Sequence, residues 1–266
     1  MTESSLPDGA TARFWRTMAA LTATACAWSG LSWLYLYLNH TELARPGTLL
    51  ATLDLPVGMP SLWSVVRPDA AQTPWFVPFL VLILQAVLSA GYLGAMVRAN
   101  LCWPVNPRTF LADGLRGFVR LLVWMVLWDL AALFTANTTV LWAAAGRVFT
   151  VLYLVAKFAL LFGDVALVAE GHLSFGGALR KALAAWAVAL PGLWPYGLAI
   201  LLVTSAATTA AGMLHPLTVL GVSLLYCAAM TWLRHLVITR YLYAARWTED
   251  TREAAQTGES YRGVHR

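Results

Sequence analysis

The sequence predicts an all-α, polytopic membrane protein with six transmembrane helices and both termini in the cytoplasm. Composition is the first observation behind this prediction. Hydrophobic residues fill 59% of the 266 positions and charged residues only 12%, whereas soluble domains have about 25% charged residues. The second observation is a mean hydropathy of +0.65, concentrated in long apolar runs. The third is the uneven distribution of Lys and Arg among the segments between those runs.

Six apolar segments are long enough to cross a bilayer, since about 20 helical residues span the ~30 Å hydrocarbon core. The expected spans are 17–38, 76–97, 117–136, 148–169, 183–208 and 214–239. The first follows Arg13 and Arg16, as in a signal peptide, but its apolar run is too long and no small-residue cleavage site follows it. We therefore expect an uncleaved anchor.

The basic residues predict the orientation. With the N-terminus in the cytoplasm, thirteen Lys and Arg residues lie inside and only Arg45, Arg67 and Arg147 lie outside. This bias favours both termini inside the cell, in the inner (plasma) membrane. The net charge of +5 then indicates contact with anionic lipid headgroups. Nucleic acid is not an expected partner, because no motif of a known nucleic-acid reader accompanies the charge.

The chain accordingly divides into a cytoplasmic segment 1–16, a transmembrane domain 17–243 and a polar tail 244–266, which is expected to be disordered. The outer loop 39–75 is the only sizeable segment between spans. Its five prolines argue against a folded domain of its own.

Two short inner loops share a pattern. Asn106 and Ser174 are good N-caps, and each begins a stretch with a hydroxyl residue, Phe, small residues and then Leu-Arg. The pattern predicts interfacial amphipathic elbows that precede outward-going spans. The basic residues expected at lipid headgroups are Arg108, Arg116, Arg180 and Lys181. The alternative is that the shared pattern has no special meaning, because any inner loop needs an N-cap and a basic residue.

The region 158–186 resembles bacterial six-span proteins related to the membrane domain of glycerophosphoryl diester phosphodiesterases. The family pattern of an acidic residue followed by small-x-Ser-x-x-x-Ala-Leu-basic is matched by Glu170, Gly171, Ser174, Ala178, Leu179 and Arg180. The stretch 108–122 is similar to the elbow that precedes it in that family. The resemblance implies a six-span membrane fold. It does not imply phosphodiesterase activity, because the sequence shows no soluble phosphodiesterase domain.

Four charged residues fall inside the predicted spans: Asp129, Lys157, Asp164 and Arg234. A charge at a helix centre costs roughly 2.5–3.5 kcal/mol on insertion scales, so we expect each of the four to have a charged partner or a functional role. Depth along the helices pairs Asp129 with Lys157 and Asp164 with Arg234. The four form a polar stripe inside the bundle, which either lines a polar pathway or locks the helices in register.

A second candidate feature is a helix break in the fifth span. Pro191, Gly192, Pro195 and Gly197 lie near its centre, and each proline frees a backbone carbonyl. Transporters often bind ligands at such breaks, although ordinary proline kinks are also common in membrane helices.

No enzymatic, metal or cofactor site is expected. The five His residues show no HExxH or paired spacing, and the chain has no GxxxxGK[ST] motif for ATP. The leading hypothesis is a non-enzymatic integral membrane protein, permease-like or an accessory subunit of a transport or envelope system. Its expected partners are membrane lipids and, as a candidate, a nucleotide-binding subunit. The alternatives are a scaffold that docks partners through the elbows and tail, and a lipid-active enzyme with Asp129 or Asp164 as base, which their depth disfavours.

Overall fold

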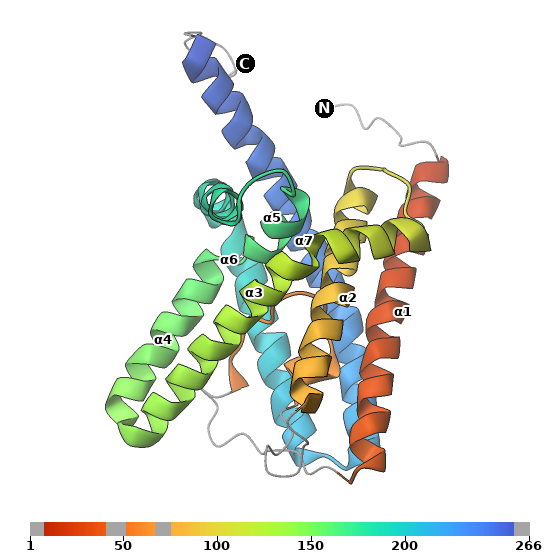
Figure 1. Cartoon of the computed structure of the whole chain (residues 1–266), viewed down its shortest axis with the longest axis vertical. Helices are drawn as coiled ribbons and strands as arrows, with labels where there is room; N and C mark the ends of the chain where they lie inside the picture. The colour runs from red at the N-terminus through yellow and green to blue at the C-terminus, as the bar shows by residue number, and fades with distance from the viewer. Residues whose placement is uncertain (1–7, 41–51, 67–75, 258–266) are drawn as a thin grey trace.

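The computed structural model describes residues 8–40, 52–66 and 76–257 (Figure 1), and all regular secondary structure within these ranges is helical. The helices are α1 (Asp8–Leu38), η2 (Leu62–Ser64), α2 (Phe76–Asn100), α3 (Pro107–Leu141), α4 (Ala143–Ala159), α5 (Gly163–Ala169), α6 (Phe175–Met213) and α7 (Pro216–Thr257). The predicted all-α class is therefore confirmed.

Among the described residues, five helical segments are long and apolar enough to cross a membrane. They are Phe76–Asn100, Pro107–Leu141, Ala143–Ala169, Phe175–Met213 and Pro216–Asp250, and each coincides with one of the predicted spans two to six. α1 covers the predicted first span, but several Thr and Ser residues lower its hydropathy, and it is not one of the five. A multi-pass membrane protein is confirmed, whereas the sixth crossing and the orientation of the termini stay predictions.

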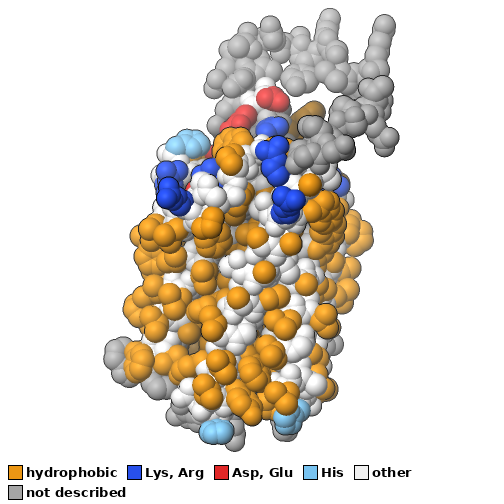
Figure 2. Space-filling view, turned by 90° about the vertical axis from the view of Figure 1, so that its right-hand side faces the viewer, with side chains coloured by type: hydrophobic (Ala, Val, Ile, Leu, Met, Phe, Trp, Pro, Cys, Tyr) orange, Lys and Arg blue, Asp and Glu red, His pale blue; other side chains and the backbone are white. Residues whose placement is uncertain are grey.

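The long helices form a bundle with one charged end. α2 packs against α3, α6 packs against α7, and α1 contacts both α2 and α7. The first turn of α1 and the last turn of α7 lie at the same end of the molecule (Figure 1). Figure 2 shows Lys and Arg side chains gathered toward that end, above a broad hydrophobic band. This asymmetry is the one that the positive-inside rule associates with a cytoplasmic face.

Both predicted elbows begin at the predicted N-caps. The Asn106 side chain accepts a hydrogen bond from Thr109 N at 2.9 Å within a capping box, and Ser174 Oγ accepts one from Gly177 N at 3.1 Å. The first turns of α3 lie across the bundle and those of α6 are seen end-on, both close to the charged end (Figure 1). Each helix then bends into its membrane-spanning part, as expected for an interfacial elbow.

The predicted break in the fifth span is wrong. α6 is one continuous helix that contains Pro191 and Pro195, and it changes direction without interruption. The interruption lies in the fourth span instead, where residues 160–162 separate α4 from α5. A Cβ added to Gly163 would lie 2.7 Å from Trp124 Cζ2, so the missing side chain there admits the Trp124 ring. Gly197 likewise admits the Phe158 ring, which makes it a packing position.

The polar tail also differs from its prediction. α7 continues to Thr257, so the first part of the tail expected to be disordered is helical. Within this extension Glu249 Oε1 lies 2.5 Å from Lys181 Nζ of α6. This ion pair joins the extension of α7 to the elbow of α6. Residues 258–266 of the predicted tail lie outside the described residues.

Glycine sets the close approach of α2 and α3, which yields a first prediction. A Cβ on Gly91 would lie 2.8 Å from the backbone oxygen of Phe110, and backbone cannot move aside cheaply. Gly91→Ala is expected to destabilise the protein by about 1–3 kcal/mol, the usual cost of overpacking. Thermal unfolding in detergent measures this. Gly30→Ala on α1, where nothing lies within 4 Å of the added Cβ, is the matched control and should not lower stability.

Candidate functional site

The central feature of the molecule is a segment inside the bundle, residues 52–66, which is irregular apart from the short 3-10 helix η2 and which we call the re-entrant segment. The prediction that all of 39–75 is an outer loop is therefore corrected for these residues. Leu55, Met59 and Leu62 are at most 2% exposed, and the segment runs among the helices in Figure 1. Irregular backbone at membrane depth is tolerated only where it is buried in protein or lines an aqueous cavity.

Side chains from four helices satisfy the backbone of the re-entrant segment. The N–H of Gly58 donates to Asp164 Oδ2 at 3.0 Å. The N–H of Met59 donates to Ser89 Oγ at 2.9 Å, and that of Leu62 donates to Ser29 Oγ at 3.0 Å. Its carbonyls accept from Gln85 Nε2 and from Arg234. The polar residues within the apolar helices thus supply hydrogen-bond partners to this backbone. A helical segment would not need such partners, because its backbone groups pair with one another.

Asp164 and Arg234 form the deepest of these contacts. Arg234 Nη1 lies 2.9 Å from Asp164 Oδ2, and both side chains are at most 4% exposed. Asp164 also accepts the N–H of Gly58, while Arg234 donates to the carbonyl of Pro56. The structure thus brings together the pair expected from depth, and this pair clamps the re-entrant segment between α5 and α7.

Lys157 finds a carboxylate that sequence analysis did not single out. Its Nζ lies 2.6 Å from Asp54 Oδ1 of the re-entrant segment, where Asp129 had been the expected partner. The ammonium also lies 4.8 Å from the ring centre of Tyr153 and 5.6 Å from that of Trp128. Lys157 is 6% exposed, so the pair and the aromatic faces together compensate for its burial.

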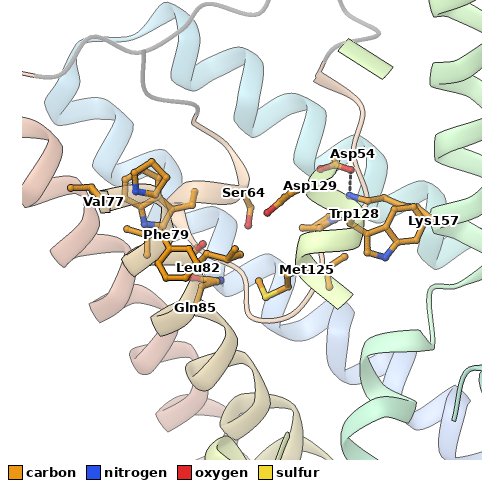
Figure 3. Close-up of a pocket in the computed structure, with 16 residues that line it drawn as sticks. Asp54, Ser64, Val77, Phe79, Leu82, Gln85, Met125, Trp128, Asp129 and Lys157 are labelled. Atoms are coloured by element: carbon orange, nitrogen blue, oxygen red, sulfur yellow. Dashed lines mark hydrogen bonds and ion pairs between the residues drawn. The ribbon is translucent and has the colours of Figure 1, made fainter. Parts of the chain in front are cut away.

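A cavity of about 540 Å³ opens beside this pair, between α2, α3, α4 and the re-entrant segment (Figure 3). Its polar lining residues are Asp54, Ser61, Ser64, Gln85, Asp129 and Lys157, and its apolar ones include Trp63, Phe79, Met125 and Trp128. Residues from the first turns of α2 line it, so it lies toward the end of the bundle opposite the Lys and Arg residues.

The route from this cavity toward the charged end is closed. A void of only about 10 Å³ lies between Lys157 and the Asp164–Arg234 pair. That is the volume of about one water molecule by the same measure, so no solute passes in this conformation. The re-entrant segment, through Leu55, Pro56 and Val57, forms one wall of the void.

The charged end has its own polar cluster. Glu170 accepts from Lys181 at 2.7 Å and from Tyr241 at 3.0 Å, and Arg120 donates to the carbonyls of Glu170, Gly171 and Leu173. Lys181, expected at lipid headgroups, is thus engaged with Glu170 and Glu249. Arg108, Arg116 and Arg180 are exposed, and their contact with headgroups stays a prediction.

Comparison with protein-family models, with curated proteins and with solved structures gives no match for this chain. The resemblance to the phosphodiesterase membrane domains therefore stays a prediction. No cluster of His, Cys, Asp and Glu suited to a metal ion occurs among the described residues. The cavity and the re-entrant segment beneath it form the candidate site.

Proposed function

We propose that this chain is a permease-like membrane protein that admits a small solute into the cavity, with the re-entrant segment as its closed gate. The six spans and cytoplasmic termini expected from the sequence place the charged end inside the cell. The cavity then faces outward. The Asp164–Arg234 pair and the re-entrant segment separate it from the cytoplasm.

One observation supports this function more than any other. Asp129 is an exposed carboxylate within an apolar span, and it lines the cavity. Charges inside a membrane face a bundle interior or a water-filled space, because exposure to lipid is costly. An aqueous cavity at this depth is what a permease needs and a purely structural bundle does not.

The closed floor supports the same proposal. A largely irregular segment that side-chain hydrogen bonds hold in place can change position without unwinding a long helix, and transporters use irregular segments at their binding sites. Such a movement would break two ion pairs and let their members find new partners. These are the pairs of Lys157 with Asp54 and of Arg234 with Asp164.

Thiol accessibility tests whether the cavity is aqueous. In a chain whose Cys26, Cys102 and Cys227 are replaced by Ala, a cysteine at Ser64 should react with a membrane-impermeant methanethiosulfonate applied from outside intact cells. Ser64 lines the cavity. We expect the Ser64→Cys protein to react at least about tenfold faster than a lipid-facing control, because thiolates form in water and not in lipid.

The matched control is Leu130→Cys, next to Asp129 on α3 and 57% exposed on its outer face. Equal, slow rates at both positions would mean a dry interior. The chain would then be a scaffold, with its charges as structural ion pairs.

A further inference from the structure

A second cavity, of about 450 Å³, lies between α2, α3, α5 and the turns that follow α2 and α5. It is at the charged end of the bundle, because α2 ends there and the elbow of α3 begins close by (Figure 1). Trp103 lines the cavity and is 57% exposed. Exposed tryptophans are typical of the membrane interface. The cavity therefore lies at the depth of lipid headgroups.

One arginine of the cavity wall is fixed in place by a buried carboxylate. Arg98 Nε lies 2.6 Å from Asp113 Oδ2, and Arg98 Nη2 lies 2.9 Å from Asp113 Oδ1. Gly94 permits this approach of α3, since a Cβ there would lie 2.7 Å from Asp113 Cβ. The pair uses two of the five N–H groups of the guanidinium, so three remain for a ligand.

Arg116 provides a second group of donors. Its side chain is exposed and lines the cavity, and among the described residues no ion pair or hydrogen bond engages its guanidinium. Arg120, one turn later on α3, instead donates to three backbone carbonyls of the turn after α5. His172 adds a ring nitrogen, with a side chain that is 73% exposed.

This lining suits a phosphate that carries apolar chains. Phosphate oxygens accept the charge-assisted hydrogen bonds that arginine donates. Leu115 and Val119 lie beside Arg116 on α3, are both 62% exposed, and share one face because they are four residues apart. A phospholipid offers a phosphate to the arginines and acyl chains to these two side chains, whereas a soluble phosphate offers only the first.

We propose that this cavity is a binding site for the phosphate of a phospholipid headgroup, with Arg98 and Arg116 as its donors. The sequence predicted only that Arg116 lies among headgroups, whereas a site also needs the fixed guanidinium of Arg98 and a space to enter. The inference does not rest on the proposed function. It concerns the other end of the bundle, and it holds whichever side of the membrane that end faces.

Native mass spectrometry of the full chain in detergent tests this inference, because each bound molecule adds its own mass. The probes are phosphatidylglycerol, a diacylglycerol with the same chains, and glycerophosphate. We expect phosphatidylglycerol to bind at least about tenfold more tightly than either of the others, since it alone combines the charge-assisted hydrogen bonds with the apolar contacts.

Two variants and their matched controls locate the site. Arg116→Gln should weaken phosphatidylglycerol about fivefold or more, because one of two charged donors is lost. Arg180→Gln, exposed on the elbow of α6 and outside the cavity, should change binding by at most about twofold.

Gly171→Leu fills the cavity and keeps both arginines. Gly171 lines the cavity, and a Cβ there would meet only Arg116 Cδ and Val168 O, both at 3.9 Å. The variant should fold and lose phosphatidylglycerol as Arg116→Gln does. Gly176→Leu, an exposed position with nothing within 4 Å of the added Cβ, should bind as the parent does.

Three results would overturn the inference. If the diacylglycerol binds as tightly as phosphatidylglycerol, the phosphate is not recognised. If glycerophosphate binds as tightly as the lipid, the ligand is a soluble phosphate and not a phospholipid. Equal losses in Arg116→Gln and Arg180→Gln, with none in Gly171→Leu, indicate diffuse attraction to a basic surface. None of these results bears on the reaction of the cysteine at Ser64, so the proposed function is tested separately.

Discussion

Replacing Arg234 by methionine is expected to destabilise the protein by about 3–5 kcal/mol, the usual cost of removing one partner of a buried ion pair. The change leaves the Asp164 carboxylate, at most 4% exposed, without its cation. It also removes the donor to the carbonyl of Pro56 in the re-entrant segment. Reversible unfolding in detergent, monitored by circular dichroism, measures the decrease in the free energy of unfolding.

A double variant separates the charge from the packing. Asp164→Asn keeps an oxygen that accepts the N–H of Gly58 but removes the negative charge. Asp164→Asn with Arg234→Met should therefore be more stable than Arg234→Met alone, since no buried charge remains unpaired. Arg246→Met, an exposed arginine of the same helix, is the control and should change stability by at most about 0.5 kcal/mol. If the double variant is no more stable than Arg234→Met, the packing of the two side chains and not their charge stabilises this contact.

Much of the bundle could be predicted because membrane helices leave strong local signals. Apolar runs, the residues Asn106 and Ser174 that cap the elbows, and the clustering of basic residues each depend on a few neighbours in the chain. The pairing of Asp164 with Arg234 was also accessible, because depth in a membrane is nearly a function of position along a helix. These predictions needed no knowledge of how the helices pack sideways.

The re-entrant segment could not be predicted by the same reasoning. Its prolines and glycine indicate irregular backbone but not its location, and whether such a backbone enters the bundle depends on partners far away in the chain. Ser29, Ser89 and Asp164 provide those partners from three helices. Asp54 was overlooked for the same reason, since its ion pair joins residues 103 positions apart.

The break in the fourth span shows a similar limit. The prolines of α6 were an obvious local signal, yet that helix bends without breaking. The actual interruption precedes Gly163 and is fixed by the ring of Trp124 from another helix. Local propensity therefore identified the wrong span, because tertiary packing decides where a membrane helix is interrupted.

Gly58→Ala is expected to have the second large effect, because this glycine fixes the turn of the re-entrant segment. Its φ of +73° lies in the left-handed region, where a side chain costs about 1–2 kcal/mol. A Cβ there would also lie 2.5 Å from Ser89 Oγ, the acceptor for the next N–H of the segment. Both effects act on one turn, so we expect a loss of at least about 2 kcal/mol and a displaced segment.

Cys227 reports the displacement directly. Its side chain is fully buried and its sulfur lies 3.6 Å from the carbonyl of Pro60, so a native segment shields it. In a chain with Cys26 and Cys102 replaced by Ala, Gly58→Ala should raise the rate at which Cys227 reacts with the impermeant thiol reagent by about tenfold or more. Gly221→Ala, with open space around the added Cβ, should leave that rate unchanged. If Cys227 stays unreactive while stability falls, the segment is a fixed part of the core and not a gate, because a gate must expose what lies beneath it when its hinge is disturbed.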